Sequence, residues 1–447
     1  MLERRALVQN ALRFLGVLAV PPFVPGLNTA LAQSNLSGTS TVSNEFASSK
    51  RLQIQGRDPV TRYSAFSIGL ETLDRELFEM RMVLPALKIL PVQNARIQSG
   101  WARSEKVAGQ YDFSWLDECV DQLISLGIKP WLNVGYGNPV FMPEAQGKGA
   151  VGWVPLFRDN AMQAWLKYVE KVAERYKNRI TYYEIWNEPY LEQFWKNAKP
   201  DPKDYARFAI PTMRAMRAIN PNAKFVVGGI GLSGKSLDYA KEFLDAGVAD
   251  YADVVSYHHY AQIPDDYYLA KINGLRQMLT RYPRKIAVWQ GESGAPSAAG
   301  TAGALREYSW DEQLQAKWVA RRMVVEAYAQ VELSSYFHLI DLVSRDAKGK
   351  IVGSPNYKGL LHAEDASPKQ AFGVYRSMVY LLAGKTPVAE GAGEWAPIAG
   401  KDTSVYGFAS GSSTNVPTMW AYWKKGAFGG EGVSLNQSAP TVEVKLG

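Results

Sequence analysis

Short apolar runs alternate with amphipathic segments from about residue 63 to residue 384 of the chain. Eight of these runs have the length and the nearly continuous apolar character of strands buried on both faces. The segments between them follow helical spacing, most clearly over 160–177, where Trp165, Val169 and Val172 share one face. The predicted strands are 65–69, 93–98, 129–135, 180–187, 224–229, 253–257, 286–291 and 333–340. The predicted helices lie near 74–89, 114–126, 160–177, 203–219, 236–246, 267–282, 311–330 and 367–383.

This alternation predicts an α/β fold. Eight strand–helix repeats over about 320 residues favour parallel pairing and a closed (β/α)8 TIM barrel. An open doubly wound sheet is the alternative, and it would carry a glycine-rich phosphate turn after its first strand. The residues found there, Gly69-Leu-Glu-Thr-Leu, do not form such a turn.

The connections from strand to helix are much longer than those from helix to strand. A barrel places these long connections on the face where the strands end, which is where active sites are built. They carry Trp101, Trp153, Trp195 and Trp310. We therefore expect an aromatic-lined groove on that face, with Trp101 and Trp195 as candidate contacts to a sugar ring. The long connections are 99–113, 136–158, 189–202, 293–310 and 341–366.

The first 32 residues resemble an export signal. Arg4-Arg5 precedes an apolar stretch from Phe14 to Val24, and Ala30-Leu31-Ala32 forms a small-x-small cleavage site. These features predict a secreted or periplasmic bacterial protein, with Sec and twin-arginine export both open. A frayed amphipathic start of a cytosolic protein is the alternative.

Helical periodicity stops at Gly384, and short apolar runs separated by turn residues follow it. This pattern predicts a small β-sheet domain that docks on the barrel. The predicted organisation is a signal peptide over 1–32, an extension over 33–62 that could add a strand to the sheet, a catalytic barrel over 63–384 and a β-sheet domain over 385–447.

Composition narrows the classes of function. Hydrophobic residues make up 47% of the 447 residues and charged residues 21%, which excludes a disordered chain. Cys119 is the one cysteine, so a disulfide framework and multi-cysteine metal sites are excluded. The net charge of +7 is scattered, without the dense basic run that nucleic acid requires. No later apolar run reaches the ~18 residues of a membrane span, so we expect no transmembrane segment.

Two carboxylates follow two of the predicted strands. Glu188 stands in Asn187-Glu188-Pro189 after the fourth strand, and Glu292 directly follows the seventh. Parallel strands of a barrel direct such residues to one mouth. Glycoside hydrolysis needs such a pair, one to protonate the leaving oxygen and one to face the developing oxocarbenium ion. A Glu at a strand end can also form a simple surface ion pair, but two of them in these places favour the catalytic interpretation.

Here the chain resembles the clan A glycoside hydrolases, which are (β/α)8 retaining enzymes. Their acid/base follows strand four, usually in Asn-Glu-Pro, and their nucleophile follows strand seven. Within the clan the chain is most similar to glycoside hydrolase family 39, which includes β-xylosidases, α-L-iduronidases and bacterial exopolysaccharide glycosidases. The motifs that carry this resemblance are Gly109-Gln-Tyr-Asp-Phe-Ser-Trp-Leu-Asp117, Tyr183-Glu-Ile-Trp-Asn-Glu-Pro189, Ser256-Tyr-His-His-Tyr260, Tyr357-Lys-Gly-Leu-Leu361 and Pro368-Lys369.

The resemblance implies a role for each matching residue. Glu188 would be the acid/base and Glu292 the nucleophile. Arg96 and Tyr260 would hold the charge of the nucleophile by an ion pair and a hydrogen bond. Asn187 would bind the sugar 2-hydroxyl, a contact that strengthens towards the transition state.

Further residues are candidates for the same pocket. His258 would touch the sugar or the nucleophile, and His338, Tyr136 and Trp289 are candidate substrate contacts. Glu184 shares the strand parity of the acid/base but lies deeper, so we interpret it as a paired interior residue. His258 and His259 could also indicate a metal site, although neighbouring strand residues point to opposite faces. No cofactor is implied, because side chains can supply both charges that the reaction needs.

The sequence thus predicts a retaining glycoside hydrolase that acts on a polysaccharide or oligosaccharide outside the cytoplasm. The long open loops favour an endo-acting exopolysaccharide hydrolase. An exo-acting β-xylosidase-like enzyme and a non-catalytic polysaccharide-binding protein on the same scaffold are the alternatives. The sugar, its linkage and the oligomeric state stay open at this stage.

Overall fold

The computed structural model describes residues 63–388, 403–410, 419–424 and 443–446. Within these ranges eight parallel strands close into a barrel, pairing in chain order, and β8 pairs back with β1. The predicted (β/α)8 barrel is therefore confirmed. The strands are β1 (Tyr63–Gly69), β2 (Val92–Gln98), β3 (Lys129–Val134), β4 (Tyr182–Ile185), β5 (Lys224–Ile230), β6 (Val254–His258), β7 (Ala287–Ser293) and β8 (Leu333–Tyr336).

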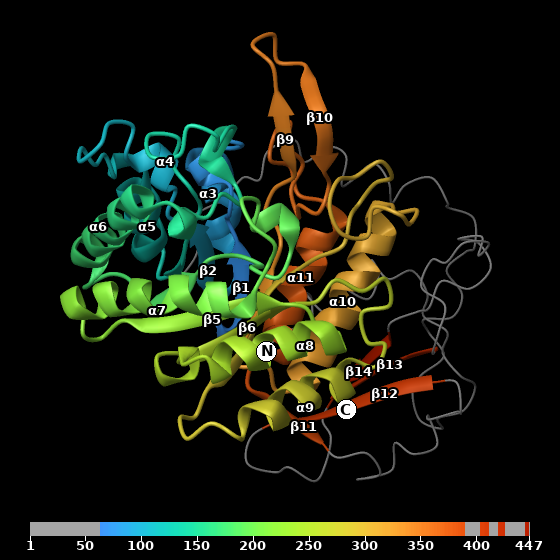
Figure 1. Ribbon diagram of the computed structural model, residues 1–447. Helices are drawn as coiled ribbons and strands as arrows, with labels where there is room; N and C mark the ends of the chain where they lie inside the picture. The colour runs from blue at the N-terminus through green and yellow to red at the C-terminus, as the bar shows by residue number, and fades with distance from the viewer. Residues whose placement is uncertain (1–62, 389–402, 411–418, 425–442, 447) are drawn as a thin grey trace, which may run out of the picture.

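Helices surround the barrel (Figure 1). On α6, Trp165, Val169 and Val172 are fully buried, as the spacing predicts. The α-helices are α3 (Met80–Ile89), α4 (Trp101–Ser104), α5 (Ser114–Ser125), α6 (Asp159–Tyr176), α7 (Pro202–Ile219), α8 (Gly234–Asp245), α9 (Tyr268–Leu279), α10 (Glu312–Tyr328) and α11 (Gln370–Leu382). Short 3-10 helices are η2 (Leu73–Arg75), η3 (Lys148–Ala150), η4 (Pro155–Phe157), η5 (Glu192–Phe194) and η6 (Val248–Asp250). None of the helices in the described ranges has the length and apolar character needed to cross a membrane.

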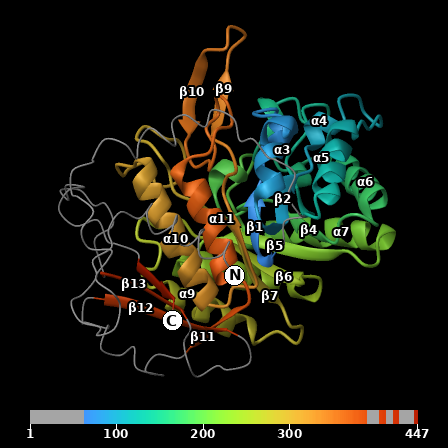
Figure 2. The same cartoon turned by 180° about the vertical axis from the view of Figure 1, so that it is seen from behind.

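A four-stranded antiparallel sheet follows the barrel and lies against α10 (Figure 2). The Tyr328 hydroxyl of α10 donates to the Val388 carbonyl at 3.0 Å, and its ring meets Tyr406 edge-on. Trp423 Nε1 donates to an Asp265 carboxylate oxygen at 2.9 Å. A C-terminal sheet docked on the barrel is what the apolar runs predict. Its strands are β11 (Lys385–Val388), β12 (Thr403–Ser410), β13 (Met419–Lys424) and β14 (Glu443–Leu446).

A hairpin of β9 (Leu342–Arg345) and β10 (Ile351–Asn356) projects from the face where the barrel strands end (Figure 1). The sequence predicts only a long loop over 341–366, because these short strands lack apolar alternation. The predicted signal peptide at 1–32 and the extension at 33–62 lie outside the described residues.

Candidate active site

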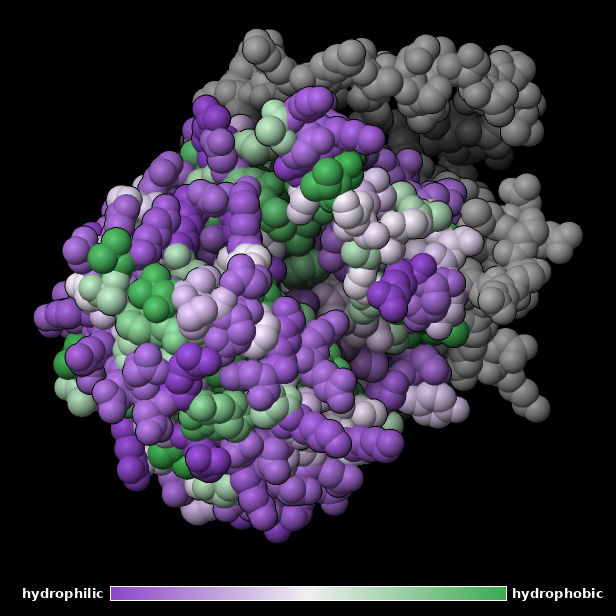
Figure 3. Space-filling model, turned by 45° about the horizontal axis from the view of Figure 1, so that its top comes forward, coloured by the Kyte–Doolittle hydropathy of each residue, from purple (hydrophilic) through white to green (hydrophobic). Residues whose placement is uncertain are grey.

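A cavity of about 770 Å³ opens at the ends of the barrel strands. Every strand contributes a residue at or just after its end, and the β9–β10 hairpin adds Leu342, Ser344, Ser354 and Asn356 to one wall. Figure 3 shows the molecule with this face turned forward, hollowed at the centre and largely polar around the opening. The residues contributed by strands one to eight are Glu71, Gln98, Tyr136, Asn187 with Glu188, Gly231, His258, Glu292 and Phe337.

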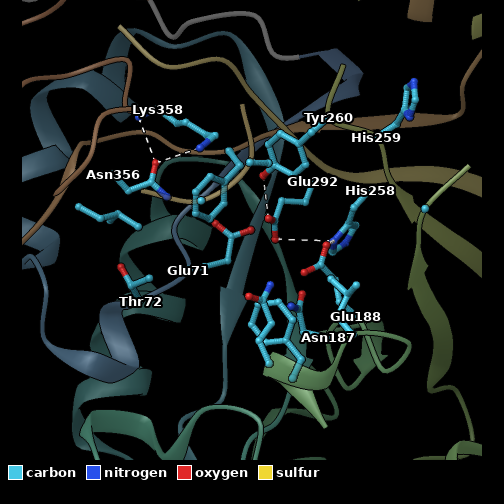
Figure 4. A pocket seen from close by; sticks show the side chains of 18 of the residues that line it. Glu71, Thr72, Asn187, Glu188, His258, His259, Tyr260, Glu292, Asn356 and Lys358 are labelled. Carbon is cyan, nitrogen blue, oxygen red and sulfur yellow. Dashed lines mark hydrogen bonds and ion pairs between the residues drawn. The ribbon is translucent and has the colours of Figure 1, made fainter. Parts of the chain in front are cut away.

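Glu188 and Glu292 both face this cavity and meet at one imidazole (Figure 4). His258 Nδ1 lies 3.1 Å from a Glu188 oxygen and 3.9 Å from a Glu292 oxygen. Backbone geometry after β4 helps to direct Glu188, since Trp186 (φ 67°) and Glu188 (φ 45°) both adopt the left-handed conformation. Such strained residues concentrate at functional sites, where the surrounding structure holds them. The two carboxylates named by the sequence therefore share one buried site.

Glu292 is held as an anion. Arg96 Nη1 donates to one carboxylate oxygen at 2.7 Å, and the Tyr260 hydroxyl donates to the other, also at 2.7 Å. Burial alone would raise the pKa of Glu292. The charges of His258 and Arg96, together with the two hydrogen bonds, outweigh burial and hold that pKa below its usual range. A carboxylate in this setting is ionised and available as a nucleophile.

The pKa of Glu188 is shifted in the opposite direction. This residue is only 8% exposed. Burial raises its pKa above the usual value, the hydrogen bond and charge of His258 oppose that shift, and the charge of Glu292 adds to it. The pKa of His258 also depends on these two carboxyls. Burial alone would lower its pKa, but Glu292 and Glu188 raise it. The geometry thus separates a proton-holding acid from an anion, which is the division of roles that acid/base assignments rest on.

Arg96 connects the residues of the site through its hydrogen bonds. All five N–H groups of its guanidinium have an acceptor, which is the full donor capacity of an arginine. Nη1 donates to Glu71 at 2.9 Å as well as to Glu292, and Nη2 donates to Asn187 at 2.8 Å. Nε and Nη2 both donate to Glu184, at 2.8 and 2.6 Å. Glu184 is therefore a paired interior residue, as its strand position indicates.

Glu71 is the member of this network that the sequence analysis missed. The single positive charge of Arg96 faces the three carboxyls of Glu71, Glu184 and Glu292, so charge balance favours a proton on one of them. Burial raises the pKa of Glu71 to about 7, with the charge of Arg96 opposing the rise and that of Glu292 adding to it. Glu71 follows the first strand as closely as Glu188 follows the fourth. The same strand-end argument could therefore have found it.

This raised pKa predicts a pH-dependent stability. The pKa of Glu71 is higher in the folded protein than its ordinary value of 4.5, so its contribution to stability is complete below pH 4.5 and is lost as the pH rises through about 7. Glu71→Gln cannot ionise and escapes this loss. Between pH 4.5 and pH 8 the difference in free energy of unfolding should therefore shift in favour of the variant, by up to about 3 kcal/mol.

Urea unfolding of both proteins at pH 4.5, 6 and 8 measures this difference. The same substitution at the exposed Glu118 controls for removal of one carboxyl from the surface. A difference between Glu71→Gln and the wild type that stays constant over this range would contradict the assignment.

The structure places several other predicted residues at the cavity. Asn187, His258, Tyr260 and Tyr136 all line it. The Tyr136 ring stacks on Phe194, which also belongs to the lining.

His258 and its neighbour His259 point to different surroundings (Figure 4). The His259 ring stacks on Tyr268 instead of facing the carboxylates. The two imidazoles are therefore not aimed at one ion. Within the described ranges no group of three His, Cys, Asp or Glu side chains is arranged to hold a metal.

Two tryptophans of the long loops do not contact the cavity, which corrects the expectation of a tryptophan-lined groove. Trp101 is fully buried, stacks on Phe141 and donates from Nε1 to Glu105 at 2.6 Å. Trp195 is also fully buried and packs edge-on against Trp186. Both rings fix loops to the barrel, and neither presents a face to a sugar.

Trp289 and His338 are also misplaced by the sequence analysis. Trp289 precedes Glu292 by three strand positions, about 10 Å deeper in the barrel, where it packs with Trp131. His338 is fully buried behind Glu71, whose carbonyl lies 2.7 Å from Nε2. Neither residue lines the cavity.

Comparisons with known proteins agree with this fold. The sequence profile described as Glycosyl hydrolases family 39 matches residues 94–282. A curated β-xylosidase from Geobacillus stearothermophilus is 30% identical over 145 residues, which are 30% of this chain and 27% of the relative. The chain thus matches only about a quarter of the length of that curated relative.

Solved structures share the architecture. A family 39 glycoside hydrolase from Bacteroides cellulosilyticus WH2 superposes with a TM-score of 0.62 at 18% identity, over 84% of this chain and 73% of that one. A β-galactosidase from Marinomonas ef1 gives a TM-score of 0.50 at 13% identity, over 71% and 59% of the two chains. At these identities the likeness shows a common fold.

The barrel and these matches make the chain similar to the clan A glycoside hydrolases. The family whose profile it matches, over residues 94–282, is family 39.

Proposed function

We propose that the protein hydrolyses a polysaccharide or oligosaccharide with retention of configuration, by double displacement. Glu292 is the nucleophile and Glu188 the acid/base. One observation carries the proposal: two buried carboxyls meet at the His258 imidazole over one cavity, with their pKa values shifted in opposite directions. A protein that only binds carbohydrate has no use for this separation of proton and charge.

In the first displacement a Glu292 oxygen attacks the anomeric carbon while the glycosidic bond breaks. The Glu188 carboxyl gives its proton to the departing oxygen, so the aglycone leaves as an alcohol. Arg96 and Tyr260 keep Glu292 ionised and oriented before the attack. Formation of the ester removes the negative charge of Glu292, which lowers the pKa of Glu188 and prepares it to act as a base.

In the second displacement Glu188 takes a proton from a water molecule, whose oxygen attacks the anomeric carbon. The bond to Glu292 breaks and restores its carboxylate. Asn187 supports both steps, because its side-chain oxygen accepts from Arg96 and its amide N–H groups are left to bind the sugar 2-hydroxyl. Two inversions at one carbon give overall retention.

We further propose a polymeric substrate outside the cytoplasm, cleaved by endo attack. The hairpin adds Leu342, Ser344, Ser354 and Asn356 to one wall of a cavity of about 770 Å³, which favours binding of several sugar residues of a chain. The export signal predicted over residues 1–32 supports an extracytoplasmic location. Exo action on a β-xyloside is the second candidate, supported by the similarity to the Geobacillus β-xylosidase.

The stereochemical outcome tests the reaction. Proton NMR of a hydrolysis mixture, recorded before mutarotation, should show that the first anomer released has the configuration of the substrate. A panel of polysaccharides, starting with exopolysaccharide from the source organism, supplies that substrate and shows endo or exo action from product lengths. Release of the inverted anomer would overturn double displacement, and binding without any turnover across the panel would favour the non-catalytic alternative.

A further inference from the structure

Lys358 is a buried cation on the wall of the cavity. It is 2% exposed and follows β10, so it reaches the cavity from the hairpin side. Its ammonium has two neutral acceptors at long distances, the Ala302 carbonyl at 3.2 Å and the Asn356 side-chain oxygen at 3.4 Å. Among the residues that the structure describes, no carboxylate lies within ion-pair distance of it.

A buried charge without a counter-ion is unfavourable unless a ligand supplies one. The chain offers a direct comparison in Lys369, a second buried lysine on the adjoining segment. Its ammonium lies 2.6 Å from an Asp341 carboxylate oxygen, as expected of a lysine with a structural role. Burial lowers the pKa of Lys358 to about 8, and the charges of Glu292 and Glu307, which act from beyond ion-pair distance, oppose that shift. Most of the ammonium is therefore still charged at neutral pH.

Two nitrogen donors and a missing side chain form a cradle beside Lys358. A Cβ atom built on Gly303 would lie 3.4 Å from the Lys358 ammonium and 3.5 Å from the Asn356 amide nitrogen. Gly303, whose φ of 82° favours glycine, leaves this space open, and all three residues line the cavity. A small planar anion fits between a cation and an amide donor placed in this way.

The cradle lies close to the reacting centre. The Lys358 ammonium is 5.7 Å from the centre of the Tyr260 ring, and the hydroxyl of that ring holds Glu292 (Figure 4). An anion held there belongs to the sugar that occupies the cavity near the nucleophile, or to its immediate neighbour.

We infer that Lys358, Asn356 and Gly303 form a subsite for the carboxylate of a uronic acid residue in the substrate. The inference rests on the proposed function, because it treats the cavity as a carbohydrate site. A carboxylate suits the cradle because its two oxygens can accept from the ammonium and from the amide together.

Binding measurements test the subsite without requiring turnover. Isothermal titration of the full chain with glucuronate, galacturonate, mannuronate and iduronate, each beside its neutral sugar, should give at least one uronate about tenfold tighter than its neutral partner. Lys358→Met should abolish this preference and leave the affinity for the neutral sugar unchanged, whereas Lys358→Arg should keep part of it. Lys271→Met is the matched control, because it removes another lysine of the cavity wall and should keep the preference.

Three outcomes would overturn the inference: no uronate preference in the wild type, a preference that survives in Lys358→Met, or a stronger preference for glucose 6-sulfate than for glucuronate. The outcomes of this test distinguish failure of the subsite from failure of the proposed function. Retaining hydrolysis of a neutral glycan without uronate preference would remove the subsite alone. Uronate binding without hydrolysis of any glycan would remove the proposed reaction alone.

Discussion

Replacing Glu292 by glutamine is expected to lower kcat by a factor on the order of 10⁴ or more while the protein keeps its fold. Glutamine has the size of glutamate and can still contact Tyr260, but it carries no charge to attack the anomeric carbon. Affinity for an oligosaccharide should change little, because the residues that line the cavity stay in place. Steady-state kinetics and a binding isotherm on the same preparation separate the two effects.

Glu188→Gln is the matched comparison. It removes the proton donor, which is worth about 10²–10⁴ in rate, and the loss should shrink for aryl glycosides with good leaving groups, because those need little protonation. Glu292→Gln should be equally slow on every leaving group. A kcat for Glu292→Gln within tenfold of wild type would contradict its role as nucleophile.

Azide distinguishes the two carboxylates by product. In Glu292→Gly an azide ion can replace the lost carboxylate and attack the anomeric carbon, which gives a glycosyl azide of inverted configuration. In Glu188→Gly the glycosyl-enzyme still forms on Glu292 from an activated substrate, and azide then gives the retained product. Exchanged stereochemistry between the two variants would mean that the assigned roles are reversed.

The barrel and its two carboxylates could be predicted because each depends on local features of the chain. Strands such as β5 are buried on both faces, so their sequences are almost wholly apolar. A residue that follows such a strand is directed to the barrel mouth by topology alone. Glu188 and Glu292 needed only this rule, and Glu71 meets it equally well.

The prediction that loop tryptophans line the cavity was wrong because burial of a loop side chain depends on contacts between distant segments. Trp101 stacks on Phe141 and packs edge-on against Trp165 of α6, and no local spacing predicts those contacts. The ammonium of Lys358 is a similar case. Its surroundings come from the 302–303 segment and from β10, which fold together only in the complete barrel.

Replacing Arg96 by methionine is expected to lower the free energy of unfolding by about 3–5 kcal/mol at pH 7, in addition to a large loss of kcat. The guanidinium is fully buried and satisfies Glu71, Glu184 and Glu292, so its removal leaves buried carboxylates without a counter-ion. The loss of stability should be smaller at pH 5, where these carboxyls can take up protons in the variant. Chemical denaturation at both pH values measures it.

Arg96→Met is expected to be unstable because it leaves an excess of negative charge among the buried carboxylates. A double variant that also removes one of these carboxylates tests this reason directly. Glu184 accepts two of the five hydrogen bonds of Arg96, so Arg96→Met combined with Glu184→Gln should be less destabilised than the sum of the single changes. Arg322→Met is the control for losing a buried arginine elsewhere. Arg322 pairs with Glu326 at 2.5 Å and does not itself line the cavity, so its loss should reduce stability with a much smaller effect on kcat than the loss of Arg96. Additive effects of Arg96→Met and Glu184→Gln would mean that Arg96 stabilises the barrel by packing, and the ionised state of Glu292 would then need another cause.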